Sequence, residues 1–294
     1  MRYQVGFAGA ARRRVFVSLI APEHPVALAL VVHGAGSYLG PYLPFAWELA
    51  STGISVTLLD LPGHGLSDGT PAHTRSHTAY LEAIGEALDW ARAACPAPST
   101  FLIGESYGAV LALLYAVGHP DPSRQQSGGN PVSGLVLSAP AFRVAGVPGW
   151  ALTAVRAMAR VAPRLRLPRG APLAVSRNPV AGEIVRRDPF LHRRLSTRYV
   201  AELVRAGEQA ARRAPEVKVP VLFLISRTDL VVDNRSTREV FSRLGTDDRT
   251  WQEFGGLAHA LLLEDPAGIA GLVSRWVQGR VCRTTHCPAQ PSQA

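Results

Sequence analysis

Short apolar runs, separated by turn-forming residues, recur along the whole chain. Each run has the length of a strand and is apolar at almost every position, which is typical of strands buried on both faces of a parallel sheet. The runs cover residues 26–32, 54–59, 101–103, 135–137 and 221–225, and residues 250–254 form a sixth strand-like segment.

Between these runs, apolar residues recur with the spacing of helices. Tyr80, Ile84 and Leu88 lie on one face of a predicted helix, and the same pattern returns at 240–244 and 269–276. Strands that alternate with helices predict an α/β fold with a doubly wound, mostly parallel sheet.

The alternation stops after Pro140 and resumes at Val219. The intervening stretch is basic, helix-prone and rich in proline, which indicates a helical cap, or lid, inserted over the ends of the strands. The predicted boundaries are 1–140 for the first part of the core, 141–215 for the cap, 216–280 for the second part of the core and 281–294 for a flexible tail.

Size and composition fit one large domain with an insertion. The chain has 294 residues, of which 47% are hydrophobic and 18% are charged, an ordinary globular balance. No apolar run reaches the roughly 18 residues that a membrane-spanning helix needs. The apolar run at 15–21 is too short and too strand-like for a signal peptide. We therefore expect a cytoplasmic protein.

The formal net charge of +9 is concentrated in the predicted cap, where residues 141–215 hold 15 arginines against 4 acids. Two interpretations are open. The cap contacts an anionic membrane surface transiently, which would make the protein peripheral to a membrane, or the arginines are ordinary solvated charge. No recognised nucleic-acid-binding motif accompanies the charge, so we expect no nucleic-acid partner.

Cysteine usage predicts neither disulfides nor a metal site. The chain has three cysteines, too few for a disulfide framework. Cys282, His286 and Cys287 lie close together in the tail, but three ligands without a fourth make a poor zinc site. We expect no metal and no other cofactor.

The most informative motif is Gly104-Glu105-Ser106-Tyr107-Gly108, which lies between a predicted strand and a predicted helix. A serine on such a turn, with glycine two residues to either side, is the nucleophile elbow of α/β-hydrolases. The glycines are needed because side chains at their positions would collide with neighbouring backbone. We expect Ser106 to be a nucleophile at the edge of the sheet.

A serine hydroxyl needs an adjacent base, and the base needs an orienting acid. In this fold the order along the chain is serine, acid, histidine. Asp229 follows the strand at 221–225, and His259 follows the strand-like segment at 250–254. Because ligands bind where the carboxyl ends of parallel strands converge, Ser106, Asp229 and His259 are expected to meet there. Asp233 is the competing acid, and Asp229 is preferred because it ends its strand directly.

The anionic intermediate of acyl transfer needs two backbone N–H donors. Tyr107, the residue after the nucleophile, offers one of them. The loop that follows the strand at 26–32 offers the second, and Ala35 is the natural donor there. In the glycine-rich turn around His64, a structural role for the histidine is favoured over a catalytic one.

Taken together, these segments resemble the monoacylglycerol lipase branch of the α/β-hydrolases, also called the serine aminopeptidase S33-like hydrolases. The resemblance runs from about residue 25 to residue 277. The matching motifs are His33-Gly-Ala-Gly36, Gly63-His-Gly65, Gly104 to Gly108, Leu137-Ser-Ala-Pro140, Asp229-Leu-Val-Val-Asp233, His259-Ala-Leu-Leu and, in the cap, Arg187-Asp-Pro189.

The resemblance implies a capped α/β-hydrolase that cleaves acyl esters of glycerol or of lysolipids without a cofactor. It also suggests that Ala35 and Tyr107 form the oxyanion hole. The chain departs from the branch at the elbow, where many members have Gly-His-Ser-Met-Gly-Gly and this chain has Glu105, Tyr107 and Ala109. Tyr107 at this place predicts a narrowed acyl pocket.

We therefore expect a serine hydrolase that cleaves monoacylglycerol-type esters through a Ser106–His259–Asp229 triad and an acyl-enzyme. The alternatives on the same triad are a lysophospholipase, a thioesterase and a general carboxylesterase or amidase. An alternative of another class is a binding protein of hydrolase origin with negligible turnover.

A predicted cap helix over 149–167 is basic and amphipathic. Ala151, Val155 and Met158, together with Ala162, lie on one face, and Arg156, Arg160 and Arg164 lie on another. Such a helix can lie in a membrane interface. The other interpretation, given somewhat more weight, is that its apolar face packs over the pocket.

Overall fold

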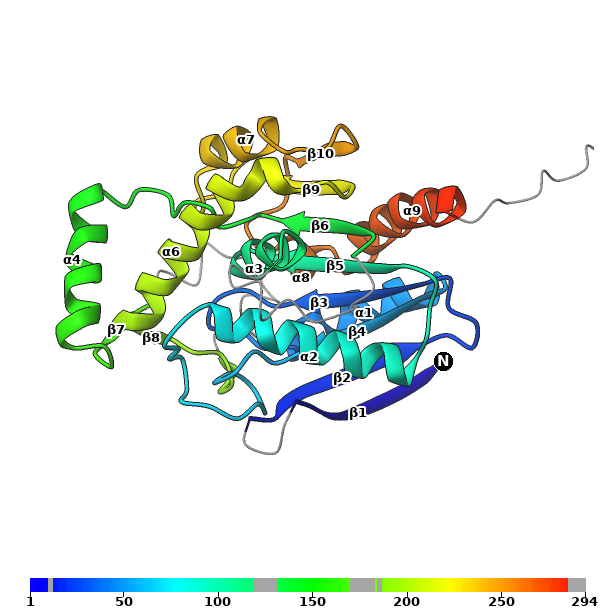
Figure 1. Cartoon of the computed structure of the whole chain (residues 1–294), viewed down its shortest axis with the longest axis horizontal. Coiled ribbons are helices and arrows are strands. Elements are labelled where there is room, and N and C mark those ends of the chain that lie inside the picture. The colour runs from blue at the N-terminus through cyan, green and yellow to red at the C-terminus, as the bar shows by residue number, and fades with distance from the viewer. Residues whose placement is uncertain (10–12, 119–131, 170–182, 184–186, 285–294) are drawn as a thin grey trace, which may run out of the picture.

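The computed structural model describes residues 1–9, 13–118, 132–169, 183 and 187–284. Its centre is an eight-stranded sheet in the order β1-β2-β4-β3-β5-β6-β9-β10 (Figure 1). The six strands from β4 to β10 run parallel, and β1 and β2 add an antiparallel edge. The strands of this sheet are β1 (Arg2–Ala8), β2 (Val15–Ala21), β3 (Ala27–Val32), β4 (Ile54–Leu59), β5 (Thr100–Glu105), β6 (Gly134–Ser138), β9 (Val221–Ser226) and β10 (Arg249–Phe254).

Helices cover both faces of the sheet. One face carries α2 (Thr78–Ala94), α3 (Tyr107–Ala116), α6 (Thr197–Arg213) and α7 (Asn234–Ser242). The other face carries α1 (Leu43–Ser51), α8 (Leu261–Glu264) and α9 (Pro266–Thr284). Short 3-10 turns lie at η1 (Gly40–Tyr42) and η4 (Ala214–Glu216).

The apolar strands form this sheet because the side chains of each strand contribute to two apolar cores, one on each face of the sheet. Successive side chains of a strand point to opposite faces. Val31 therefore packs with α1 and α9, and its neighbour Val32 packs with α2 and α3. A strand buried in this way has few polar positions, which is the pattern seen in the sequence.

The six predicted strands are all present, and each end agrees within two residues. The antiparallel edge formed by β1 and β2 was not predicted. Strand β1 is mostly exposed and alternates polar and apolar residues, unlike the buried strands, which are apolar at almost every position. It pairs with β2 in a register that places Tyr3 opposite Ile20.

In the described residues between β6 and β9, the segment predicted as a cap contains two helices and two short strands before η4. These elements are α4 (Gly149–Val161), β7 (Arg166–Pro168), β8 (Arg194–Ser196) and α6, and β7 pairs with β8 in a separate two-stranded sheet. Helix α4 packs against α6 at one end of the main sheet (Figure 1).

The prediction of one helix over 149–167 was too long. Helix α4 ends at Val161, and Ala162 leaves the helical region with φ −136° and ψ 62°. The reason is Pro163, whose ring disfavours a helical conformation in the residue before it.

At the other end of the chain, α9 extends to Thr284, four residues into the segment predicted as a tail, and His286 and Cys287 lie outside the described residues. The boundaries of the cap stay a prediction.

In the described part of the chain, none of the helices combines the length and the apolarity required to cross a bilayer.

The turn from β5 to α3 is pressed against β3 so closely that it depends on glycine. A Cβ atom added at Gly108 would overlap the carbonyl oxygen of Val32, and one added at Gly104 would overlap the backbone of Gly108. These contacts are backbone to backbone, so no side chain can move aside to relieve them.

We expect Gly108→Ala to lower the free energy of unfolding by about 3 kcal/mol or more, because the added methyl group forces two elements apart. Gly279→Ala is the matched control, since this exposed helical position has no atom within 4 Å of an added Cβ. That control should gain about 0.5–1 kcal/mol from the loss of glycine flexibility. Chemical denaturation measures both, and a Gly108→Ala protein as stable as the parent would contradict the packing described here.

Candidate active site

Ser106 lies at the sharp turn between β5 and α3, in a backbone conformation that L-residues rarely adopt. Its φ of 57° and ψ of −115° lie outside the ordinary regions for a residue with a side chain. Two backbone hydrogen bonds hold it there. Its N–H donates to the carbonyl of Ser138 at 2.8 Å, and its carbonyl accepts the N–H of Ala141 at 3.1 Å.

The structure brings the three side chains predicted to act together into one hydrogen-bonded chain. Nε2 of His259 lies 2.9 Å from Oγ of Ser106, and Nδ1 of His259 lies 2.8 Å from Oδ2 of Asp229. The side chain of Asp229 is fully buried and that of His259 is 6% exposed. Residues 106, 229 and 259 thus meet at the carboxyl edge of the sheet, as the strand positions predict.

Asp229 is held rigidly by its own loop. Its second oxygen, Oδ1, accepts the N–H groups of Val231 at 2.8 Å and Val232 at 3.1 Å. Because both N–H groups donate to Oδ1, Oδ2 remains available to accept from the imidazole. Asp233, the competing acid, instead caps α7 by accepting the N–H of Arg235 at 3.0 Å.

The loop after β3 lies directly against the nucleophile. A Cβ added at Gly34 would lie 3.4 Å from Cβ of Ser106. Ala35 is the next residue, and Tyr107 begins α3 on the other side of the serine. Neither the Ala35 N–H nor the Tyr107 N–H donates a hydrogen bond to any residue that the structure describes. Both N–H groups therefore stay candidates for the two donors that an oxyanion requires.

His33 fixes the shape of this loop. Its Nδ1 lies 2.8 Å from the carbonyl of Gly34, and its Nε2 accepts the N–H of Leu61 at 3.0 Å. These partners assign the neutral tautomer with the proton on Nδ1. Burial lowers the pKa of His33 to about 4, so the ring stays neutral and keeps both bonds at ordinary pH.

Residues between β6 and β9 also form hydrogen bonds with the same loop. The N–H of His192 donates to the carbonyl of Gly36 at 2.8 Å, and the Gly36 N–H donates to the Tyr199 hydroxyl at 3.4 Å. The Tyr38 hydroxyl donates to Asp188 at 2.7 Å. Asp188 belongs to the Arg187-Asp-Pro189 motif, so this motif lies against the loop that follows β3.

His64 is buried among aromatic rings, in agreement with the structural role expected for it. Its ring centroid lies 5.1 Å from those of both His33 and His192. Burial holds the pKa of His64 well below its usual value. Tyr107 is also fully buried, and its ring packs edge-on against Tyr199 at 5.9 Å.

Glu105, the residue before the nucleophile, received no role from the sequence. Its side chain is almost completely buried, and its Oε1 accepts the N–H of Leu262 at 3.0 Å and the hydroxyl of Ser138 at 3.2 Å. Burial raises the pKa of Glu105 to about 7, while the Leu262 N–H and the charge of His259 act in the opposite direction. Only its place next to Ser106 could have singled it out in the sequence.

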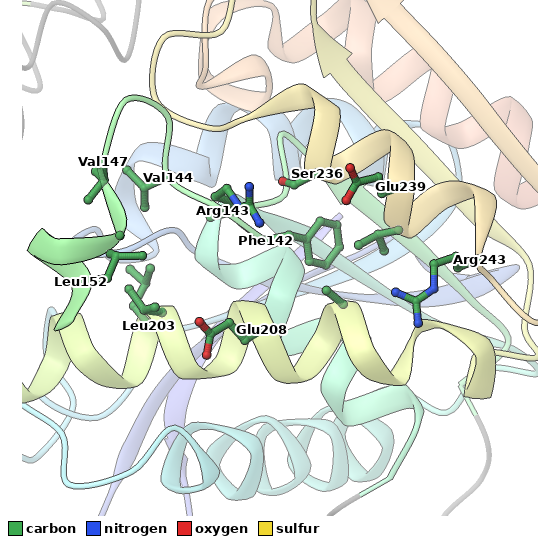
Figure 2. Close-up of a pocket in the computed structure, with 15 residues that line it drawn as sticks. Phe142, Arg143, Val144, Val147, Leu152, Leu203, Glu208, Ser236, Glu239 and Arg243 are labelled. Atoms are coloured by element: carbon green, nitrogen blue, oxygen red, sulfur yellow. The ribbon is translucent and has the colours of Figure 1, made fainter. Parts of the chain in front are cut away.

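A separate cavity of about 350 Å³ lies between α4, α6, α7 and the chain that leaves β6 (Figure 2). Phe142 and Leu203 form part of its apolar wall, and Arg143 and Glu239 are among its charged residues. It includes none of Ser106, Asp229 and His259. It adjoins the loop of the acid, because Val144 in its wall pairs with Val232.

The chain is similar to known hydrolases in both sequence and fold. Residues 23–266 match the family model of the serine aminopeptidase S33 hydrolases. The chain belongs to this family. It is 27% identical over 245 residues to phospholipase YtpA of Bacillus subtilis, covering 82% of this chain and 91% of that one. It is 26% identical over 260 residues to human monoglyceride lipase, covering 87% and 84% of the two chains.

Among solved structures, the monoacylglycerol lipase of Paleococcus ferrophilus superposes with a TM-score of 0.78 at 26% identity, covering 90% of this chain and 99% of that one. The predicted α/β-hydrolase fold and the resemblance to the monoacylglycerol lipase branch are thereby confirmed. The family member described here is a carboxylic ester hydrolase of the lipase and esterase kind.

The raised pKa of Glu105 predicts a particular pH dependence of stability. In the folded state the carboxyl has a pKa of about 7, above its ordinary value of 4.5, so the folded protein holds this proton more tightly than the unfolded chain does. The stabilisation from that proton is therefore complete below pH 4.5 and is lost as pH rises to about 7.

Glu105→Gln removes this ionisation. Relative to the parent, we expect the variant to gain about 2 kcal/mol in free energy of unfolding between pH 5 and pH 8. Urea denaturation at the two pH values measures the change. A difference between the two proteins that is the same at pH 5 and pH 8 would show that the carboxyl keeps its ordinary pKa.

Proposed function

We propose that this protein hydrolyses monoacylglycerol-type lipid esters through a Ser106–His259–Asp229 triad and an acyl-enzyme intermediate. The observation that carries the proposal is the unbroken hydrogen-bonded chain from Ser106 Oγ through His259 to Asp229, at 2.9 and 2.8 Å. Hydrogen-bond reach between nucleophile and base, and between base and orienting acid, is the geometric requirement for an activated serine.

In the first half of the reaction, Ser106 Oγ attacks the ester carbonyl while its proton passes to Nε2 of His259. Asp229 holds the Nδ1–H of the ring and stabilises the imidazolium that forms. The tetrahedral oxyanion accepts hydrogen bonds from the N–H groups of Ala35 and Tyr107. His259 then gives the proton to the leaving alcohol, the bond between the carbonyl carbon and that oxygen breaks, and the acyl group remains on Ser106.

In the second half, a water molecule takes the place of the alcohol. His259 removes a proton from the water as it attacks the acyl carbon, and the same two N–H groups hold the second oxyanion. The bond to Ser106 Oγ breaks, the serine regains its proton from His259, and a free carboxylic acid leaves.

The names of the relatives support monoacylglycerols as the proposed class of substrate. The proteins from human and from Paleococcus ferrophilus are named as lipases of monoglycerides, and each alignment covers more than four fifths of this chain. A lysophospholipid is the second candidate. The relative named phospholipase favours it, as do the exposed arginines on α4, which complement an anionic headgroup.

The two candidate substrates differ in the headgroup alone, so one panel of esters distinguishes them. Monoacylglycerols and lysophospholipids of matched acyl length should be compared at equal micelle concentration. A kcat/KM higher for the glycerol esters supports the first candidate, and the reverse order supports the second.

We further propose that α4 contacts anionic membrane surfaces with its outer face. Trp150 is 75% exposed and Val161 is 84% exposed, and exposed alanines lie between them at helical spacing. Leu165, which is 49% exposed, lies between the end of α4 and β7. The face predicted to be apolar, with Val155 and Met158, is partly buried where α4 packs against α6.

The arginines on α4 are not equivalent. Arg156 forms an ion pair with Glu208 on α6, so its charge is balanced within the protein. Arg160 near the end of α4, and Arg164 three residues beyond that end, are exposed and form no ion pair with the described residues. Apolar side chains flanked by uncompensated cations are the features that bind a helix to an anionic interface.

Replacing the nucleophile tests the reaction. Ser106→Ala should lower ester turnover by about 10⁴-fold or more, because the attacking atom is lost, and should abolish covalent labelling by a fluorophosphonate probe. Ser242→Ala, at an exposed serine of α7, is the control and should keep both. Full labelling of the Ser106→Ala protein would refute the assignment.

Replacing the outer face of α4 tests the membrane contact. The double variant Trp150→Ala/Val161→Ala, and separately Arg160→Gln/Arg164→Gln, should each weaken binding to phosphatidylglycerol-containing vesicles about tenfold in a co-sedimentation assay. Arg212→Gln, on an exposed turn of α6, should leave binding unchanged. Equal binding by all these proteins would leave the cap arginines as ordinary surface charge.

A further inference from the structure

We propose that Glu105 is a positioning residue of the reaction, whose ionised carboxylate holds the histidine loop and the oxyanion loop in register and stabilises the imidazolium of His259. The inference rests on the proposed function of Ser106 and His259. It assigns a role to a side chain that does not itself touch the reacting atoms.

The contacts of Glu105 join separate parts of the site. Through its own backbone it is the last residue of β5, directly before the nucleophile. Its Oε1 accepts the N–H of Leu262, three residues after His259, and the hydroxyl of Ser138, whose carbonyl holds the Ser106 N–H. One carboxyl group therefore connects the strand of the nucleophile with the loop of the base.

A second connection runs toward the oxyanion loop. The hydroxyl of Tyr42 accepts the N–H of Gly34 at 3.1 Å, one residue before Ala35. The same hydroxyl lies close enough to Glu105 for each group to shift the pKa of the other, the larger cause for both being burial. Tyr42 is thus the link between the carboxyl and the loop that carries the proposed oxyanion donor.

Burial opposes ionisation of this carboxyl and raises its pKa to about 7, while the hydrogen bonds that it accepts favour the ionised form, which is the main form above pH 7. The Leu262 N–H can only donate, and the Ser138 hydroxyl is placed to donate to the same oxygen, so an acceptor-only carboxylate fits both. The groups that act on its charge are His259, from the loop before α8, and Tyr42, from η1, beside the uncharged donors of Leu262 and Ser138. Of these, only His259 becomes a cation during the reaction.

That cation gives the carboxylate its second effect. Proton transfer from Ser106 creates a positive charge on the imidazole, and a buried negative charge nearby stabilises it. Asp229 acts on the ring by direct hydrogen bond, and Glu105 acts through space and through the position of Leu262. A neutral residue at 105 would leave the base weaker and its loop less firmly held.

The test compares Glu105→Gln, which removes the charge, with Glu105→Asp, which keeps the charge on a shorter side chain. Two readouts are followed from pH 5 to pH 9. They are kcat/KM for a soluble short-chain ester, and the rate constant for fluorophosphonate labelling of Ser106. The position of interest is the acid midpoint, the pH at which either quantity falls to half of its plateau on the acid side.

For Glu105→Gln we expect kcat to fall about tenfold with KM changed less than about twofold, and the acid midpoint to move to lower pH by about half a unit or more. Glu105→Asp should lose kcat because of its length but keep the acid midpoint. Ser138→Ala removes one hydrogen bond to the carboxylate and so favours protonation of Glu105. The ionised form is then lost at a higher pH on the acid side, so the acid midpoint of this variant should move to higher pH.

A Glu105→Gln protein with the parental kcat and acid midpoint overturns the proposal. So does an equal loss of kcat in the Gln and Asp variants with no movement of the midpoint, which would indicate packing alone. If Glu105→Gln does not fold, Ser138→Ala decides, and an unmoved midpoint counts against the proposal. Absence of labelling at Ser106 in the parent would instead refute the proposed function, so the two failures are distinguishable.

Discussion

The close backbone contact between the β5–α3 turn and strand β3 is the constraint on which the rest of the site depends. Gly104 and Gly108 allow the turn to lie against Val32 with no side chain between them. Because the turn is fixed there, Ser106 is held at a positive φ with its oxygen toward His259. The loop that carries Ala35 starts from the end of the same strand β3, so the proposed nucleophile and the proposed oxyanion donors are both held against this strand.

Several groups near this contact between the turn and β3 are held in the site in states that lower the stability of the fold. Ser106 has an unfavourable backbone conformation, and Glu105 is a carboxyl group removed from water. His33 is buried in a neutral form that keeps two hydrogen bonds. Unfavourable features of this kind persist only where the surrounding structure over-determines them, and they concentrate at functional sites. Here the two large apolar cores on either side of the sheet supply the compensating stability.

Much of the fold could be predicted because its strands are buried on both faces. Strands such as β4 are apolar throughout, and their parallel arrangement places every carboxyl end at one edge. Position at a strand end was therefore sufficient to bring Ser106, Asp229 and His259 together in prediction. The edge strand β1 escaped prediction because an exposed strand lacks this pattern, and its pairing depends on residues far along the chain.

Other features depend on neighbours that local sequence does not reveal. The sequence of α4 indicates a helix with apolar residues on more than one side, and only the position of α6 determines that Val155 faces inward while Trp150 remains exposed. The ion pair between Arg156 and Glu208 likewise joins residues of two helices. The contacts of Glu105 are even harder to predict from the local sequence. Its partners Ser138 and Leu262 lie 33 and 157 residues away along the chain, so its environment exists only in the folded protein.

A crystal structure of the protein after reaction with a fluorophosphonate would test the central claim most directly. The account predicts one covalent bond, from phosphorus to Ser106 Oγ, with the phosphoryl oxygen about 2.7–3.1 Å from the N–H groups of both Ala35 and Tyr107. His259 should remain hydrogen-bonded to Asp229 in the adduct. An adduct on another residue, or a phosphoryl oxygen turned away from both N–H groups, would contradict it.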